Sequence, residues 1–122
     1  MKKAYDKVPD SRSDRLGEKR TRVVACIRAL PRGTVSSYGA IAKAAGWPGA
    51  ARQVVRILQQ TRGLPWHRVI GAGGAIKLGG ENAAEQRFRL RMEGVGFRGM
   101  RVDMKRHEYK FPKKSAKGGV LL

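Results

Sequence analysis

Cysteine, acidic residues and long apolar runs are scarce in this sequence of 122 residues. Cys26 is the only cysteine, which excludes an intrachain disulfide and a zinc site built from several thiolates. No uninterrupted apolar segment approaches the roughly 18 residues that a membrane-spanning helix needs. Basic residues open the chain, but no apolar stretch follows them, so the N-terminus does not predict a secretory signal. These absences favour a cytoplasmic protein, associated with the nucleoid if the source is bacterial.

Basic residues, by contrast, are abundant. The chain has 27 lysines and arginines against nine aspartates and glutamates, which gives a formal net charge of +18. Such an excess destabilises a compact fold by self-repulsion and is typical of proteins whose partner is a polyanion. We therefore expect a nucleic-acid partner, with an anionic membrane surface or a ribosomal role as the lesser alternatives.

The composition divides the chain into three segments. Residues 1–13 predict a mobile basic arm, residues 14–109 one folded domain, and residues 110–122 a basic, largely mobile tail. The chain contains 41% hydrophobic and 30% charged residues, so it has room for one globular domain with a modest core.

A first helix is predicted from Asp14 onwards. Val23, Ile27 and Leu30 recur at i, i+4 and i+7, which places them on one apolar face, and the proline and glycine that follow end the helix. Cys26 neighbours this face. Because no histidine or aspartate adjoins it in the sequence, we interpret it as a core thiol rather than a nucleophile.

Two short helices joined by a tight turn come next. Ser37 is a suitable N-cap for a helix over residues 38–45, residues 47–49 form a turn, and a second helix runs over residues 50–60. This pattern predicts a helix-turn-helix. The second helix begins with small residues, Ala50 and Ala51, which permit close approach to a DNA groove, and continues with Arg52 and Gln53, which can reach into it.

The remaining pattern is mixed. Residues 66–70 are mainly apolar, the glycines of residues 71–74 suggest a hairpin turn, and residues 75–78 suggest its second strand. Residues 82–85 match a capping box, so a helix is expected to begin there and to end at Glu93 before Gly94. The predicted fold class is α+β and mostly helical: a helix-turn-helix, winged-helix-like DNA-binding domain with a small β-hairpin.

Three motifs carry a resemblance to a known family. They are Ser37-Tyr38-Gly39, Ala51-Arg52-Gln53-Val54 and Pro65-Trp66-His67-Arg68-Val69-Ile70, in that order. Together they resemble the DNA-binding domain of the O6-alkylguanine-DNA alkyltransferases, whose signature is Pro-Cys-His-Arg-Val. The chain is most similar to the alkyltransferase-like branch, which has tryptophan at the cysteine position, and the resemblance covers about residues 16–98.

This resemblance implies roles for individual residues. Tyr38 would crowd the phosphate of the lesion and help to rotate the nucleotide out, and Arg52 would enter the base stack from a helix in the minor groove. His67 and Glu93 match the proton relay of the active enzymes, and Arg68 matches an arginine held beneath the site. The implied lesion pocket comprises Tyr38, Trp66, His67, Arg68 and Glu93; the implied DNA-binding residues are Tyr38, Ala50, Ala51, Arg52 and Gln53.

Dealkylation requires a thiolate that attacks the alkyl carbon. An indole supplies only an N–H donor and an aromatic face, so Trp66 cannot replace that thiolate. We therefore expect a non-enzymatic sensor. The resemblance implies that it flips O6-alkylguanine out of double-stranded DNA and flags it for nucleotide excision repair. The expected partners are that DNA and nucleotide excision repair proteins, with no membrane partner, no metal and no organic cofactor. One flipped base requires only a monomer.

Three alternatives remain open at this point. One is a sequence-specific helix-turn-helix transcription regulator, and another is a nonspecific architectural protein. The third is an enzyme, an alkyltransferase or hydrolase, that uses His67, Glu93 or Cys26 as another nucleophile. The second wall of the pocket is also open, because the tyrosine and serine that the active family has near Lys77 and Leu78 are missing here.

Overall fold

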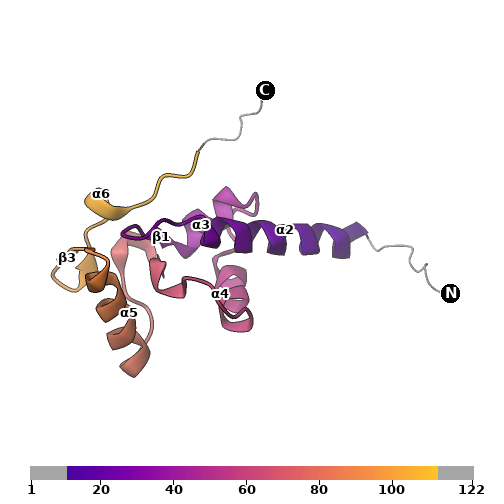
Figure 1. The fold of residues 1–122 in the computed structure, drawn as a ribbon. Coiled ribbons are helices and arrows are strands. Elements are labelled where there is room, and N and C mark those ends of the chain that lie inside the picture. Colours follow the sequence, from indigo (N-terminus) through magenta and orange to yellow (C-terminus); the bar gives the residue numbers. More distant parts are fainter. Residues whose placement is uncertain (1–10, 113–122) are drawn as a thin grey trace.

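The computed structural model describes residues 11–112, with side chains from Leu16 onwards. Figure 1 shows the long helix α2 running across α3 and α4, with α5 and a small hairpin beyond them. No helix within these residues is long and apolar enough to cross a membrane. In chain order the elements are α2 (Ser11–Arg28), β1 (Ser36–Ser37), α3 (Tyr38–Ala44), α4 (Ala51–Gln60), η1 (Trp66–Arg68), β2 (Val69–Ile70), η2 (Ala72–Gly74), α5 (Gly80–Met92), β3 (Phe97–Arg98), β4 (Arg101–Val102) and α6 (Met104–His107).

The larger core lies between α2, α3 and α4. The apolar face predicted for the first helix is confirmed, since Val23, Ile27 and Leu30 are all buried. They pack with Ile41 of α3 and Val54 of α4, among others. The Ser37 cap is also confirmed, because its hydroxyl accepts a hydrogen bond of 3.1 Å from the backbone N–H of Ala40. The helix-turn-helix is thus fixed by packing behind it and by a cap at its start.

A two-stranded parallel sheet joins this core to a second one. Ser36 pairs with Val69 and Ser37 with Ile70. Successive side chains of a strand point to opposite faces. Val69 therefore packs into the helical core, while Ile70 packs into a second cluster with Val35, Leu90, Val95 and Val102.

The hairpin predicted over residues 69–78 is wrong. Residues 72–74 form a short 3-10 turn, residues 75–78 form no strand, and β2 pairs with β1 instead. The antiparallel hairpin of this fold lies later, where Phe97 of β3 pairs with Val102 of β4. A small hairpin is therefore present, but its position was not visible in the glycine pattern.

The capping box predicted at residues 82–85 is also wrong. Helix α5 begins two residues earlier, at Gly80, and its N-cap Gly79 contributes no side-chain hydrogen bond. Glu85 does not reach back to the helix start, because its carboxylate accepts a 2.6 Å bond from Arg89 Nε one turn further on. The end of the helix is as predicted: Gly94 follows it with a φ of 85°.

Ordered structure extends into both segments that the sequence predicted to be tails. Helix α2 starts at Ser11, three residues before the predicted boundary at Asp14. At the other end, the ring of Phe111 packs edge-on against Tyr109, with centroids 4.9 Å apart, and both rings contact the helical core. Residues 1–10 of the predicted arm and 113–122 of the predicted tail lie outside the described residues.

Gly74 joins η2 to the hairpin. Its φ is +89°, and a Cβ there would overlap the Val102 carbonyl oxygen and lie 3.0 Å from Val102 N. We expect Gly74→Ala to lower the free energy of unfolding by about 3 kcal/mol or more, because backbone strain adds to this overlap. Gly99→Ala in the same hairpin is the control: its φ is +62° but no atom lies within 4 Å of the added Cβ, so it should cost only about 1–2 kcal/mol. Equal losses in urea denaturation would contradict the close packing at Gly74.

Candidate nucleic-acid interface

The exposed face of α4 carries polar and basic residues. Arg52, Arg56 and Gln59 recur at i, i+4 and i+7 and are all exposed, so they form one row, the α4 ridge. Gln53 is half-buried beside this row, and Ala51 is half-buried in the first turn. Of the predicted DNA-binding residues, Arg52 is the one that the fold presents most freely to solvent.

Ala50 differs from the sequence expectation. Its side chain is 3% exposed and packs in the helical core rather than facing a groove. It is the N-cap of α4, with its N–H donating to Trp47 O and its carbonyl accepting from Val54 N. This position ties the turn to the helix, so the small size of Ala50 serves packing of the turn.

An apolar cavity of about 210 Å³ lies beside the α4 ridge. Tyr38 and Trp66, both half-buried, face it from α3 and η1. Burial raises the pKa of the Tyr38 hydroxyl above 10.0, so this group is a neutral hydrogen-bond donor at physiological pH. The full lining consists of Tyr38, Val55, Leu58, Gln59, Trp66, Val69, Leu78 and Asn82.

The second wall of this cavity, open in the sequence, is formed by Leu78 and Asn82. The lining residues Val55 and Gln59 were also missed. They lie three and seven positions after Arg52, so a helical projection of residues 51–60 could have placed them near it. For Leu78 the signal was the family resemblance, which left the second wall open near Lys77 and Leu78; the segment 75–78 has no regular structure from which the direction of its side chains follows.

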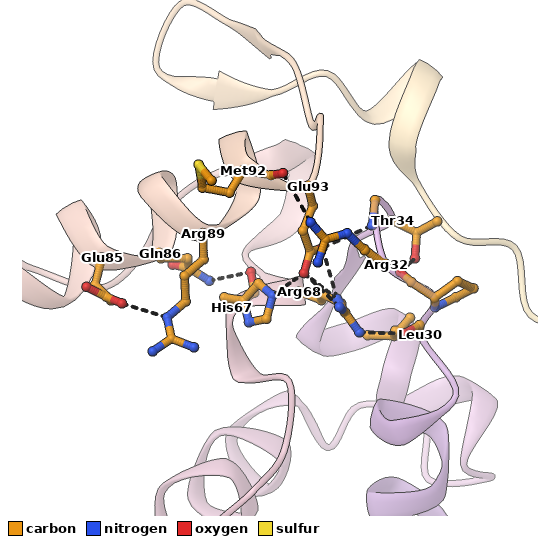
Figure 2. Close-up of polar contacts among 12 residues, drawn as sticks. Leu30, Arg32, Thr34, His67, Arg68, Glu85, Gln86, Arg89, Met92 and Glu93 are labelled. Carbon is orange, nitrogen blue, oxygen red and sulfur yellow. Dashed lines mark hydrogen bonds and ion pairs between the residues drawn. The ribbon is translucent and has the colours of Figure 1, made fainter.

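His67, Arg68 and Glu93 do not line the apolar cavity. They form a polar network behind it, in which the Glu93 carboxylate is the shared acceptor (Figure 2). Arg68 Nη2 and His67 Nε2 each lie 2.7 Å from Glu93 Oε2, and the backbone N–H of Gly33 donates to Oε1 at 3.0 Å. Arg68 Nη1 also donates a bond of 3.0 Å to the carbonyl of Leu30, which fixes the guanidinium to the chain just after α2.

The charge state of this network follows from its contacts. Burial alone would raise the pKa of the Glu93 carboxyl, but the bonds from Arg68, Gly33 and His67 outweigh it and lower the pKa from 4.5 to about 2. Glu93 is therefore ionised at neutral pH. Since a carboxylate only accepts, the Nε2 of His67 carries the hydrogen of their bond. Within the described residues His67 Nδ1 is buried without a hydrogen-bond partner.

Trp66 is held from two sides. Its indole meets the His67 ring edge-on, with centroids 6.2 Å apart, and the Arg89 guanidinium carbon lies 5.5 Å from its ring centroid. Glu85 in turn holds Arg89. Gln86 is 1% exposed, and its Nε2 donates to the backbone carbonyls of His67 and Val69 at 3.2 and 2.9 Å. These bonds fix the backbone that follows Trp66 (Figure 2).

On its other side Trp66 borders a wider, basic cleft. This hollow of about 690 Å³ is lined by Arg28, Gly63, Leu64, Pro65, Trp66, His67, Arg68 and Arg89. The five predicted pocket residues are thus divided: Tyr38 and Trp66 line the apolar cavity, His67 and Arg68 line the basic cleft with Trp66, and Glu93 lies beneath. Cys26 lines neither hollow and packs against the helical core from α2. Among the described residues no group of three potential metal ligands is present.

The helix-turn-helix and the basic α4 ridge beside an apolar cavity are the features of a nucleic-acid-binding domain. Residues 18–95 match the family described as 6-O-methylguanine DNA methyltransferase, DNA binding domain. The chain belongs to this family.

Two relatives share a large part of the sequence. The DNA base-flipping protein of Escherichia coli (strain K12) is 40% identical over 94 residues, which cover 74% of this chain and 73% of that protein. Alkyltransferase-like protein 1 of Schizosaccharomyces pombe is 40% identical over 85 residues, which cover 67% of this chain and 79% of that protein.

Solved structures agree with these relatives. The crystal structure of S. pombe Atl1 in complex with damaged DNA containing O6-carboxymethylguanine matches with a TM-score of 0.65 and 33% identity, covering 77% of this chain and 96% of Atl1. Mycobacterium tuberculosis OGT in complex with DNA matches with a TM-score of 0.55 and 36% identity, covering 61% of this chain and 48% of OGT. The predicted fold class, a mostly helical helix-turn-helix domain with a small sheet, is confirmed.

The residue at the family's reactive position decides the class of activity. By the resemblance, Trp66 stands where the family signature has its cysteine, and an indole does not attack an alkyl carbon. The relatives named above are a base-flipping protein and an alkyltransferase-like protein. This chain has the DNA-binding fold of the family with a tryptophan in the Pro-Trp-His-Arg-Val motif.

The Glu93 network gives a prediction of stability against pH. We expect Glu93→Gln to lower the free energy of unfolding by about 3 kcal/mol at pH 7, since lowering the pKa from 4.5 to about 2 is worth roughly 1.4 kcal/mol per unit. A carboxyl with a depressed folded-state pKa stabilises fully above its unfolded pKa. That contribution is lost as the pH falls from about 5 through 2.

Urea denaturation of both proteins across this pH range measures the effect. The difference between wild type and variant should be constant from pH 7 to about 5 and then shrink towards pH 2. Glu81→Gln, at an exposed position on the same helix, is the matched control and should leave stability nearly unchanged. A difference that stays constant down to pH 2 would show that the Glu93 carboxylate is not stabilised as described.

Proposed function

We propose that this chain binds O6-alkylguanine in duplex DNA, extrudes the modified nucleotide into the apolar cavity and leaves the alkyl group in place. The observation that carries the proposal is the apolar cavity lined by Tyr38 and Trp66 directly beside the exposed α4 ridge, in a chain with a net charge of +18. The O6 atom of guanine lies at the major-groove edge of the base pair, so a protein that approaches from the minor groove can enclose an O6-alkyl group only if the nucleotide leaves the stack. The relative crystallised with DNA containing O6-carboxymethylguanine supports this class of ligand.

The dimensions of the cavity suit one base. Its volume of about 210 Å³ is smaller than the roughly 300–1,000 Å³ of pockets for drug-sized ligands. Its walls are mostly aliphatic and aromatic, with the Tyr38 hydroxyl and the amides of Gln59 and Asn82 as the polar groups. Such a lining binds a base by contact with its faces and offers a few hydrogen bonds to its edges.

Arg52 and Tyr38 are assigned to the extrusion step. Unstacking costs a few kcal/mol, which contacts made only after extrusion must offset. Arg52 lies exposed in the first turn of α4, from which its guanidinium can fill the space that the base leaves. Tyr38 begins α3 and borders the cavity, where its ring can hold the nucleotide out of the stack. By family resemblance, this helix approaches from the minor groove.

The fate of the lesion follows from the missing thiol. Because Trp66 cannot accept the alkyl group, binding ends in a stable complex on unrepaired DNA. We propose that this complex is the signal that nucleotide excision repair proteins recognise, and that one chain forms it as a monomer. A sequence-specific regulator or an architectural protein would instead bind damaged and undamaged duplexes of the same sequence equally.

Replacing Arg52 tests the extrusion step. Arg52→Ala is expected to weaken binding to a duplex with one O6-methylguanine by about 1–3 kcal/mol more than binding to the unmodified duplex, because only extrusion uses the inserted guanidinium. Arg98→Ala, which also removes an exposed positive charge, on β3, is the control and should change binding to both duplexes alike. Fluorescence anisotropy at one salt concentration measures all four affinities. An equal loss on both duplexes for Arg52→Ala would make this residue an ordinary phosphate contact.

The breadth of recognition tests the cavity. Since no alkyl carbon has to be aligned with a thiolate, we expect affinity to stay level or to rise from O6-methyl to O6-butyl, by at most roughly 0.8 kcal/mol per added CH₂. Leu78→Phe narrows the cavity and should reduce binding of butyl more than of methyl. Competition binding across the alkyl series in one duplex sequence measures this. If wild-type affinity falls steeply beyond methyl, Trp66 closes the cavity against larger groups and the proposed breadth is refuted.

A further inference from the structure

A second hollow borders α4 on its other flank. This α2–α4 cleft has a volume of about 400 Å³ and lies between the N-terminal half of α2 and the side of α4. Figure 1 shows that α2 extends past α4 at this end of the molecule. The cleft is lined by Leu16, Gly17, Arg20, Trp47, Gln53, Arg56, Ile57 and Gln60.

The period of the helix places this cleft opposite the apolar cavity. Gln53, Ile57 and Gln60 recur at i, i+4 and i+7 and form the flank of α4 that faces the cleft. Val55 and Leu58 form the opposite flank, which faces the apolar cavity. The α4 ridge of Arg52, Arg56 and Gln59 lies between the two hollows on the exposed side of this helix.

The cleft has the chemistry of a phosphodiester site. Arg20 and Arg56 are exposed, and no acidic residue is among its described lining. Arg20 is oriented by the bond from its Nη1 to Gln60 Oε1, of 3.2 Å, which uses one of the five guanidinium donors. Lys19 Nζ lies 5.5 Å from the Trp47 ring centroid and adds a third cation beside the cleft.

Apolar surface lies between these cations. Leu16 is 47% exposed, and Trp47 is half-buried in the wall of the cleft. A backbone of alternating sugars and phosphates presents alternating apolar and anionic groups to its partner. Surfaces that bind it without reading sequence combine donors for the phosphate oxygens with contacts to the sugars.

A groove of duplex DNA is bounded by two phosphate backbones, one from each strand. When the α4 ridge enters a groove, one backbone lies along each flank of the helix. The flank with the apolar cavity must face the strand that carries the lesion, because the extruded nucleotide enters there. The other flank, with the α2–α4 cleft, then faces the complementary strand.

We propose that the α2–α4 cleft binds the phosphate backbone of the complementary strand through Arg20 and Arg56. This inference rests on the proposed function, since the lesion defines which strand is which. The contact holds the strand whose bases stay stacked while the other strand gives up its nucleotide. It adds affinity for damaged and undamaged duplexes alike and leaves the preference for the lesion to the apolar cavity.

Neutral methylphosphonate linkages test the assignment of strands. Single linkages are placed at successive positions of either strand in a duplex with one O6-methylguanine, and affinities are measured for wild type, Arg20→Ala and Arg56→Ala. Each lost phosphate contact lowers the salt slope by about 0.9, which at 0.1 M salt corresponds to about an eightfold loss of affinity. We expect such a loss in wild type at one or two positions of the complementary strand, and no further loss there in Arg20→Ala. Alanine is a good helix former, so an exposed arginine on α2 can be replaced without unfolding the chain.

The control is Arg98→Ala, which should keep the full sensitivity to the complementary-strand linkages. The inference is overturned if Arg20→Ala and Arg56→Ala remain as sensitive as wild type, or if their missing sensitivity maps to the lesion strand. In both cases an intact preference for O6-methylguanine shows that the proposed function stands. A wild-type chain that binds damaged and undamaged duplexes equally refutes the proposed function, and the strand assignment with it.

Discussion

The arrangement of the site depends on one buried carboxylate. Glu93 lies just beyond the end of α5, and its two oxygens accept bonds from Gly33, from His67 and from Arg68. Three chain segments that are far apart in the sequence are thereby joined at one point: the turn after α2, the 3-10 turn η1 and the end of α5. Trp66 begins η1 and is adjacent in sequence to His67, so the bonds to this carboxylate help to fix the wall of the apolar cavity, together with Arg89 and Gln86.

The same contacts explain why such a network persists in a chain without a thiol. By family resemblance, His67 and Glu93 match residues that relay a proton in the active enzymes. Here both are buried, Glu93 is bonded to His67 Nε2 and to Arg68, and neither lines the apolar cavity. Removing one partner would leave the others as uncompensated buried polar groups, which is costly in itself. The network therefore has a structural reason to be kept that is independent of any proton transfer.

Local patterns in the sequence predicted the helices that frame the site, but not the paths between them. The spacing of Val23 and Ile27 and the hydroxyl of Ser37 act over one or two turns, and both expectations were confirmed. The hairpin and the capping box failed for a different reason. Val69 and Ile70 pair with β1, and Glu85 bonds Arg89. The local sequence pattern does not indicate either partner. Likewise, the division of the predicted pocket into a cavity and a cleft on the two faces of Trp66 depends on how α5 packs against η1.

The alternation of Val69 and Ile70 has a consequence for how this chain can evolve. These adjacent residues of β2 enter two different cores, one built by the helices and one by α5 with the hairpin. A substitution that changes the volume of either core can shift the same two-residue strand. This strand directly follows η1, which begins with Trp66. Substitutions in the hairpin can therefore alter the binding surface. Sequence positions in the two cores should accordingly change together across descendants of this chain, although no side chain of one core belongs to the other.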